Sequence, residues 1–237
     1  TLSLHDALPI WECMQRELVT AQAGISNRDA YFLMERERLK AVPVLDDAGR
    51  LHGVLTKDDA VRLELLEASV NAAGQLMVAA AIGISNEARA RAEAVLALGV
   101  DVLVLDTAHG HQRKMIEAVR AVREVAGEGV PLVAGNVCTV EGTRELIGAG
   151  ADVVKVNVGP GAMCTTRMQT GVGRPTFSAV RACAAEARRL GKHVWADGGV
   201  RHPRDVALYC AAGAARVMVG TLLAGTSASP GAVEIDA

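Results

Sequence analysis

Residues 151–167 read ADVVKVNVGPGAMCTTR, an apolar run followed by a glycine-rich loop that carries a cysteine. The apolar run over 151–156 predicts a buried parallel strand. A strand that ends in such a loop is a common way to hold a nucleophile, here Cys164, over the end of a sheet or barrel. Inward-turned carbonyls of the same loop also suit a cation. The alternative is a small buried thiol in a turn, since most single cysteines are packing residues.

From residue 75 onward, apolar runs alternate with helical patterns. The predicted strands cover residues 76–81, 101–105, 130–134, 152–156, 193–196 and 216–219. The predicted helices cover residues 86–98, 112–126, 140–149, 177–190 and 203–212. Each helix tends to end at a glycine before the next strand, which is typical of a left-handed C-cap.

This alternation predicts an α/β fold with a parallel sheet, and many equal units favour a (β/α)8 TIM barrel. A Rossmann fold is disfavoured because no Gly-x-Gly-x-x-Gly opens a helix after the first strand. Only six strand–helix units are present, whereas a closed barrel needs eight. We therefore expect residues 74–237 to be a partial (β/α)8 catalytic barrel that lacks two early units. An open six-stranded sheet is the alternative.

Composition narrows the class of protein. The 237 residues are 50% hydrophobic but only 3% aromatic, and the formal net charge is -2. A basic stripe is missing, so nucleic acid is not an expected partner. Apolar runs are too short to span a bilayer, so no membrane association is expected. The five cysteines match neither a zinc site nor a disulfide framework, which indicates reduced thiols and a cytoplasmic protein.

The N-terminal third has a different pattern. Residues 1–10 show no hydrophobic periodicity that continues into the sequence after them. We interpret them as a non-native leader. A predicted helix over 27–40, strands over 41–45 and 51–56, and a helix that begins after Thr56 as N-cap resemble a CBS motif. Residues 11–73 are therefore predicted to be a partial CBS-like module, with adenine nucleotide as a possible ligand. A small packing module without ligand is the alternative.

Polar or glycine-rich residues follow five successive strands of the predicted barrel. Because the loops after barrel strands carry function, these residues are expected to share one face. Glycines after the last two strands suit a phosphate, which backbone N–H groups bind. Asp197, directly after a strand, suits ribose hydroxyls, although an Asp before two glycines is also a common turn residue. Asp106 suits a cofactor or a base.

Residues 72–231 resemble the IMP dehydrogenase / GMP reductase family. The motifs that carry the resemblance are LDTAHGH (105–111), VAGNV (133–137), GPGAMCTTR (159–167), ADGG (196–199) and VMVGT (217–221). The resemblance implies that Cys164 attacks C2 of a purine mononucleotide, GMP or IMP, and that Thr166 assists proton transfer there. It also implies the following ligand contacts: Asp197 for the ribose; Gly198, Gly199, Gly220 and Thr221 for the phosphate; and Asp106, Thr107, Ala108, Val158 and Gly159 for NADPH or NAD.

The resemblance further implies a monovalent cation, potassium in most members, and a homotetramer. The cation would be held by Gly159, Gly161, Cys164 and Arg167. Asn157 stands where the family usually has glycine, and we expect it to alter the loop or its cation site.

The direction of the reaction is read from the run after the nucleophile. Thr170-Gly171-Val172-Gly173 resembles the reductases, and the CBS-like segment with LDTAHG resembles the dehydrogenases. The combination resembles an actinobacterial branch that carries CBS domains yet reduces GMP. We therefore expect a GMP reductase, with IMP dehydrogenase as the alternative. A nucleotide-binding inactive or regulatory fragment, and a phosphate-binding barrel of other chemistry, remain open.

Overall fold

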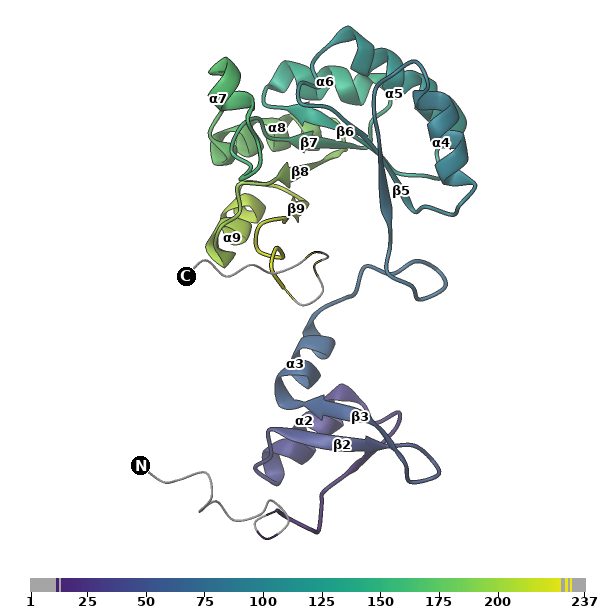
Figure 1. Ribbon diagram of the computed structural model, residues 1–237, viewed down its shortest axis with the longest axis vertical. Helices are drawn as coiled ribbons and strands as arrows, with labels where there is room; N and C mark the ends of the chain where they lie inside the picture. Colours follow the sequence, from purple (N-terminus) through teal and green to yellow (C-terminus); the bar gives the residue numbers. More distant parts are fainter. Residues whose placement is uncertain (1–11, 13, 227–228, 230, 232–237) are drawn as a thin grey trace. The chain divides into compact units, whose positions relative to one another are not determined.

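The computed structural model describes residues 12, 14–226, 229 and 231, and the predicted leader at 1–10 lies outside them. The chain divides into two compact units, Thr1–Ser69 and Val70–Ala237. This division lies close to the boundary that the sequence places after residue 73. Figure 1 shows a small unit with one short sheet and a larger unit with a helix-covered sheet.

Over its described residues from 14 onward, the first unit is a three-stranded sheet with two helices on it. Its elements are β1 (Ala21–Gln22), α2 (Asn27–Arg36), β2 (Ala41–Leu45), β3 (Leu51–Thr56) and α3 (Lys57–Leu65). The predicted hairpin is confirmed, with β2 antiparallel to β3, and β1 adds a parallel edge strand that the pattern did not predict. Thr56 caps α3 as predicted, because its hydroxyl accepts the N–H of Asp59 at 3.1 Å.

The second unit is a six-stranded parallel sheet whose strands lie in chain order. Its strands are β4 (Ala79–Ile82), β5 (Val102–Asp106), β6 (Leu132–Val137), β7 (Val153–Val156), β8 (His193–Asp197) and β9 (Arg216–Met218). Its helices are α4 (Ala88–Leu96), α5 (Arg113–Ala126), α6 (Val140–Ala149), α7 (Thr166–Thr170), α8 (Thr176–Arg189) and α9 (Pro203–Ala211). This is the α/β architecture predicted, consistent with part of a (β/α)8 barrel.

Two details of the second unit differ from the predicted pattern. β4 begins at Ala79 rather than at residue 76. Leu76 instead forms an isolated antiparallel bridge with Val70, and in the turn between them the Asn71 side chain accepts the N–H of Gln75. The short helix α7 follows the cysteine loop directly and was not predicted. It ends at Gly171 in the left-handed conformation, φ 70°, which glycine adopts without strain.

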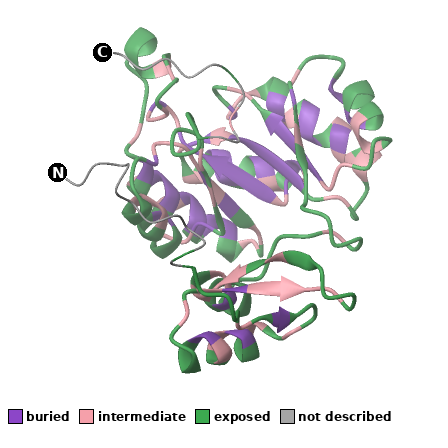
Figure 2. Ribbon diagram, turned by 60° about the horizontal axis from the view of Figure 1, so that its bottom comes forward, coloured by how far each residue is buried: buried purple, intermediate pink, exposed green. Residues whose placement is uncertain are grey.

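The two faces of the sheet have different neighbours. Leu103, Leu132, Val154 and other residues of one face pack under the helices in a single large core. The other face carries a smaller apolar cluster of Val102, Val104, Val133 and Val153, with Trp195 against it. Figure 2 shows the central strands as the most buried part of this unit. The smaller cluster lies below the cavity described in the next section. The charged residues of that cavity lie two residues further along the same strands, nearer their carboxyl ends.

Candidate active site

A cavity of about 310 Å³ opens at the carboxyl ends of β5 to β8. It is lined by Asp106, Thr107, Ala108, Asn136, Lys155, Asn157, Val158, Gly159, Pro160, Gly161, Cys164, Thr166, Asp197 and Gly198. The structure thus brings together most of the residues that sequence reasoning placed in a site. Parallel strands achieve this because their carboxyl ends meet at one edge of the sheet.

Cys164 lies in the loop between β7 and α7, and it is partly exposed to the cavity. Its N–H donates to the Gly161 carbonyl at 3.1 Å, which closes a tight turn under the thiol. The pKa of Cys164 lies below its ordinary value, chiefly because the Thr166 hydroxyl and then the Thr166 N–H hydrogen-bond the sulfur. The N–H of Gly159 and the charge of Arg167 lower it further. Partial exposure and a lowered pKa are the environment of a reactive thiol rather than of a packing residue.

The other thiols of the second unit have no such environment. Burial raises the pKa of Cys138 to about 11, and burial also raises the pKa of Cys183. Both side chains belong to the packed interior between β6 and α8, where Cys183 donates to the Thr139 carbonyl at 3.5 Å. Among the thiols of this unit that have shifted pKa values, only Cys164 is shifted toward the reactive thiolate.

The loop before Cys164 is shaped by glycines that pack against the segment after it. Gly159 has φ 100°, and a Cβ there would lie 3.1 Å from the Cβ of Arg167. Gly198 and Gly199, at the end of β8, also have positive φ values of 73° and 71°. A Cβ on Gly199 would lie 3.3 Å from Pro160 Cβ. The two glycine segments therefore pack close together beside the cavity.

A buried charge network forms the base of the cavity. Lys155 of β7 has a side chain that is 3% exposed, and its Nζ lies 2.5 Å from Asp197 Oδ2 and 3.0 Å from Asp106 Oδ1. Asn136 also donates to Asp197 Oδ2, at 2.7 Å. Its other amide atom, Oδ1, is buried without a protein partner. A buried acceptor without a donor calls for one, and a ligand hydroxyl or amide in the cavity would supply it.

Comparison with known proteins identifies the relatives of this chain. The family model described as "IMP dehydrogenase / GMP reductase domain" matches residues 25–237. The chain belongs to the IMP dehydrogenase / GMP reductase family. It is 54% identical to the GMP reductase of Mycobacterium tuberculosis over 215 residues, which is 91% of this chain and 45% of the relative. It is 46% identical to the inosine-5'-monophosphate dehydrogenase of Staphylococcus aureus over 222 residues, 93% of this chain and 45% of the relative.

Solved structures of the family agree with this assignment. A cysteine-to-alanine variant of Trypanosoma brucei GMP reductase, in complex with guanosine 5'-monophosphate, superposes with a TM-score of 0.67 at 38% identity. That match covers 93% of this chain and 46% of the solved one. The same enzyme in complex with guanosine 5'-triphosphate gives 0.65 at 39% identity, covering 89% and 50%. The chain thus spans about half the length of the curated relatives that it matches.

The remaining residues that the family resemblance singled out lie around the cavity rather than in it. Gly220 and Thr221 follow β9, at the same edge of the sheet, but are not among the residues that line the cavity. The Gly198 N–H donates to the Met218 carbonyl at 3.2 Å, which ties the two late strand ends together. Arg167 lies on α7 with its side chain packed against Gly159 and Gly173.

Asn157, which the sequence predicts to alter the loop, joins the ends of two strands. Its side chain is 3% exposed, and its amide nitrogen donates to the Asp197 carbonyl. Its amide oxygen accepts the Thr176 hydroxyl at 3.2 Å, at the start of α8. The Asn157 side chain therefore links the end of β7 to the end of β8 and the start of α8, below the loop. Asn157 could be noticed in the sequence, but its partners could not be predicted from it.

Lys155 and Asn136 are the polar residues that sequence reasoning left without a role. A signal for Lys155 was available, because a lysine inside the apolar run 153–156 must be buried, and a buried ammonium needs a partner. Asn136 follows four small or apolar residues of β6 and lies at the same strand edge as the other site residues. Which carboxylates they pair with depends on strand register, which the sequence does not state.

Proposed function

We propose that this chain carries part of the active site of a purine nucleotide oxidoreductase that converts GMP to IMP with NADPH. The observation that carries the proposal is the thiol of Cys164, with its pKa lowered by Thr166, in one cavity with the carboxylates of Asp106 and Asp197. Relatives named GMP reductase support the direction of the reaction. Because the chain covers about half of each relative, the activity of the whole protein is part of the proposal.

In the proposed reaction, the Cys164 thiolate attacks C2 of GMP and forms a C–S bond. The C2 amino group leaves as ammonia after it gains a proton, and the Thr166 hydroxyl, beside the sulfur, relays that proton. Bound NADPH supplies the hydride that reduces C2. The C–S bond then breaks and returns the thiolate with IMP. Covalent attachment keeps C2 electrophilic while ammonia leaves and hydride arrives.

The remaining roles follow from the family resemblance and from position in or beside the cavity. Asp197 accepts the ribose hydroxyls. Gly198, Gly199, Gly220 and Thr221 hold the 5'-phosphate beside the cavity, with the N–H groups of the last three as donors, because the Gly198 N–H already bonds the Met218 carbonyl. The cofactor side is Asp106, Thr107, Ala108, Val158 and Gly159, and the carboxylate of Asp106 is 46% exposed. The unpaired Oδ1 of Asn136 fits a hydroxyl or amide donor of either ligand.

A monovalent cation would be held by backbone carbonyls of Gly159, Gly161, Cys164 and Arg167. Carbonyl oxygens suit a hard cation. Two of these carbonyls already accept one hydrogen bond each, Gly161 from Cys164 at 3.1 Å and Arg167 from Gly171 at 3.0 Å. A carbonyl has a second lone pair, so the donor set still fits. Its proposed contribution is to fix the shape of the loop that carries the thiol.

The test is a pair of assays on the longest natural protein that contains this chain. GMP with NADPH, and IMP with NAD, are each followed by the absorbance of the reduced nicotinamide. We expect loss of absorbance with GMP, abolished by Cys164→Ala and dependent on potassium. Turnover that survives Cys164→Ala would refute the proposal in favour of a different chemistry. Binding of GMP with no turnover in either assay would favour a binding-only protein.

A second candidate is IMP dehydrogenase, supported by the 46% identity to that enzyme. The residue that favoured the reductase, Thr170, does not face the cavity. Its hydroxyl donates to the Thr166 carbonyl at 2.7 Å and accepts the Val172 N–H at 3.1 Å, which ends α7. Thr170 therefore shapes the loop, and only the assays decide the direction. Gain of absorbance with IMP and NAD would establish the dehydrogenase.

Two further parts of the proposal concern the first unit and assembly. The helix–hairpin–helix order of the first unit supports a CBS-type module, for which adenine nucleotide is the proposed ligand. Titration of the protein with ATP in a calorimeter tests it. For the oxidoreductase we propose a homotetramer in the cytoplasm, and light scattering tests the assembly. None of the described helices is long and apolar enough to cross a membrane.

A further inference from the structure

We propose that Lys155 is a positioning residue that joins the nucleotide-facing Asp197 and the cofactor-facing Asp106 into one charge-paired unit. The proposal rests on the proposed function for the ligands that the two carboxylates face. Its consequence is that the two ligand subsites share a single counter-ion, so that loss of Lys155 weakens both. The carboxylates come from β8 and β5, and the lysine comes from β7.

Lys155 reaches Asp106 across an intervening strand. In the sheet order β5, β6, β7, Asp106 pairs with Gly135, and Gly135 pairs with Lys155. Gly135 has no side chain, so nothing stands between the lysine and the carboxylate two strands away. A Cβ at Gly135 would lie 2.6 Å from Lys155 Cβ. The glycine in the middle strand is what permits the Nζ to lie 3.0 Å from Asp106.

The hydrogen bonds leave Asp197 poised toward a ligand. Lys155 and Asn136 both donate to Oδ2, at 2.5 Å and 2.7 Å. Within the described part of the chain, no hydrogen-bond donor reaches the other oxygen, Oδ1. The carboxylate is thus held by two donors on one side, with its second oxygen available to hydroxyl groups in the cavity. Two fixed donors set the orientation of a carboxylate more firmly than one.

The negative charges of Asp106 and Asp197 require the positive charge of Lys155 between them. Its ammonium is almost fully buried, and one positive charge faces two carboxylates. Without it, Asp106 and Asp197 would be neighbouring like charges in a half-buried cavity with no cation between them. Such a pair repels, and the carboxylates move apart. This movement displaces the acceptor that the ribose needs.

The experiment is a double-variant cycle, read by calorimetric binding of GMP to the longest natural protein that contains this chain. We expect Lys155→Met to weaken GMP binding on the order of 100-fold, the usual effect of removing one partner of a buried charge pair. NADPH binding should weaken in the same variant. Adding Asp106→Asn to Lys155→Met should recover about tenfold of the GMP affinity, because the repulsion is gone.

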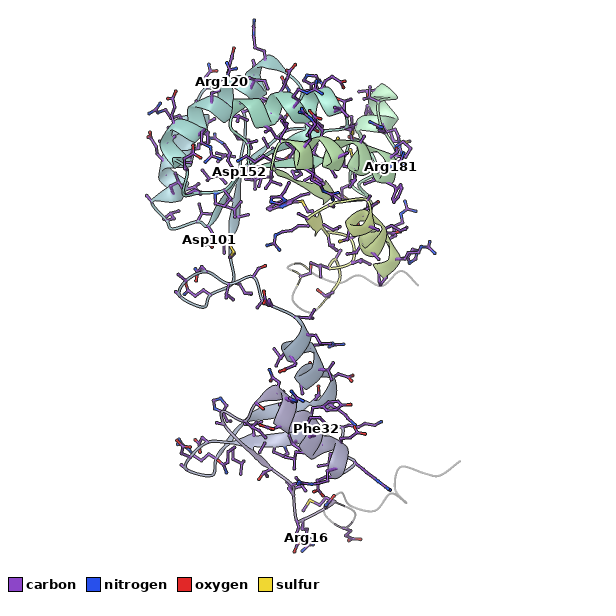
Figure 3. The ribbon with its side chains drawn as sticks, turned by 180° about the vertical axis from the view of Figure 1, so that it is seen from behind. Arg16, Phe32, Asp101, Arg120, Asp152 and Arg181 are labelled. Atoms are coloured by element: carbon purple, nitrogen blue, oxygen red, sulfur yellow. The ribbon has the colours of Figure 1, made fainter. Side chains whose placement is uncertain are left out.

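Matched variants separate positioning from folding. Lys155→Arg keeps the charge and should retain most GMP affinity, and Lys155→Gln replaces Lys155→Met if that variant does not fold. Lys192→Met is the control. Lys192 pairs with Asp152 at 2.6 Å at the amino-terminal ends of the strands, away from the cavity, so GMP binding should be unchanged. Asp152 is labelled in Figure 3.

The outcomes distinguish this proposal from the proposed function. Unchanged GMP affinity in Lys155→Met overturns it, and so does a loss that Asp106→Asn does not relieve, since that indicates a general structural role. A wild-type protein that binds GMP without turnover refutes the proposed reaction but supports Lys155 if the cycle behaves as expected. A wild-type protein that binds neither GMP nor IMP overturns both.

Discussion

Gly135→Ala tests the close approach of β6 and β7 most directly. A Cβ on Gly135 would lie 2.4 Å from the Lys155 carbonyl oxygen and 2.6 Å from Lys155 Cβ. Ordinary contacts of this kind begin at 3.4 Å, so the strands would have to separate by about 1 Å. The first contact is with backbone, which no change of rotamer relieves. The ladder on either side of Gly135 must therefore distort.

The expected cost is about 3 kcal/mol of unfolding free energy, the upper end of the usual range for overpacking. Domains are stable by only about 5–15 kcal/mol, so this loss is easily measured. The assay is urea denaturation followed by circular dichroism. Gly148→Ala is the matched control, because Gly148 lies in α6 with no atom within 4 Å of a new Cβ. It should gain about 0.5–1 kcal/mol from helix propensity.

A loss below about 0.5 kcal/mol for Gly135→Ala, the range of an ordinary surface substitution, would refute the reasoning. It would mean that β6 and β7 separate freely at this point. A loss in both glycine variants would point instead to a general intolerance of alanine. Only a large loss at Gly135 with a gain at Gly148 supports the steric argument.

Three further outcomes are expected. Thr166→Val removes the largest cause of the low pKa of Cys164, so the pH at which iodoacetamide labels this thiol should rise, and an unchanged labelling profile would contradict it. Glu186 is paired with Arg189 and has its pKa lowered to about 2, so it stabilises the fold above pH 4.5 and loses that effect as the pH falls through 2. The difference in melting temperature between wild type and Arg189→Ala should be present at pH 6 and should shrink as the pH falls toward 2. Leu132→Ala, at a fully buried position, should cost about 2–5 kcal/mol in urea denaturation.

The elements of the second unit could be predicted because local pattern determines them. All six strands and the five longer helices lie where the alternation of apolar runs and helical periods placed them. Buried parallel strands are continuous apolar runs, so their positions survive errors at the ends. The exceptions were short. α7 has five residues and β1 has two, and segments of that length carry too few residues for a period to show.

The members of the candidate site were predictable for a similar reason, and their pairings were not. Asp106, Cys164 and Asp197 each follow a strand, and strand ends meet at one edge. The pairing of Lys155 with Asp106 and Asp197 depends on the register between neighbouring strands. β6 and β7 shift register between Gly135 and Val137, and nothing local marks such a shift. The partners of Asn157 likewise come from β8 and α8, far along the chain.

Gly135 gives one cause for two properties of the sheet. The missing side chain lets the backbones of β6 and β7 approach closely, and it also leaves the path by which Lys155 reaches Asp106. Any side chain there would strain the ladder and obstruct the lysine together. Stability and the Lys155–Asp106 ion pair therefore cannot be varied independently at this position, whereas at Leu132, under the helices on the opposite face, only packing is affected.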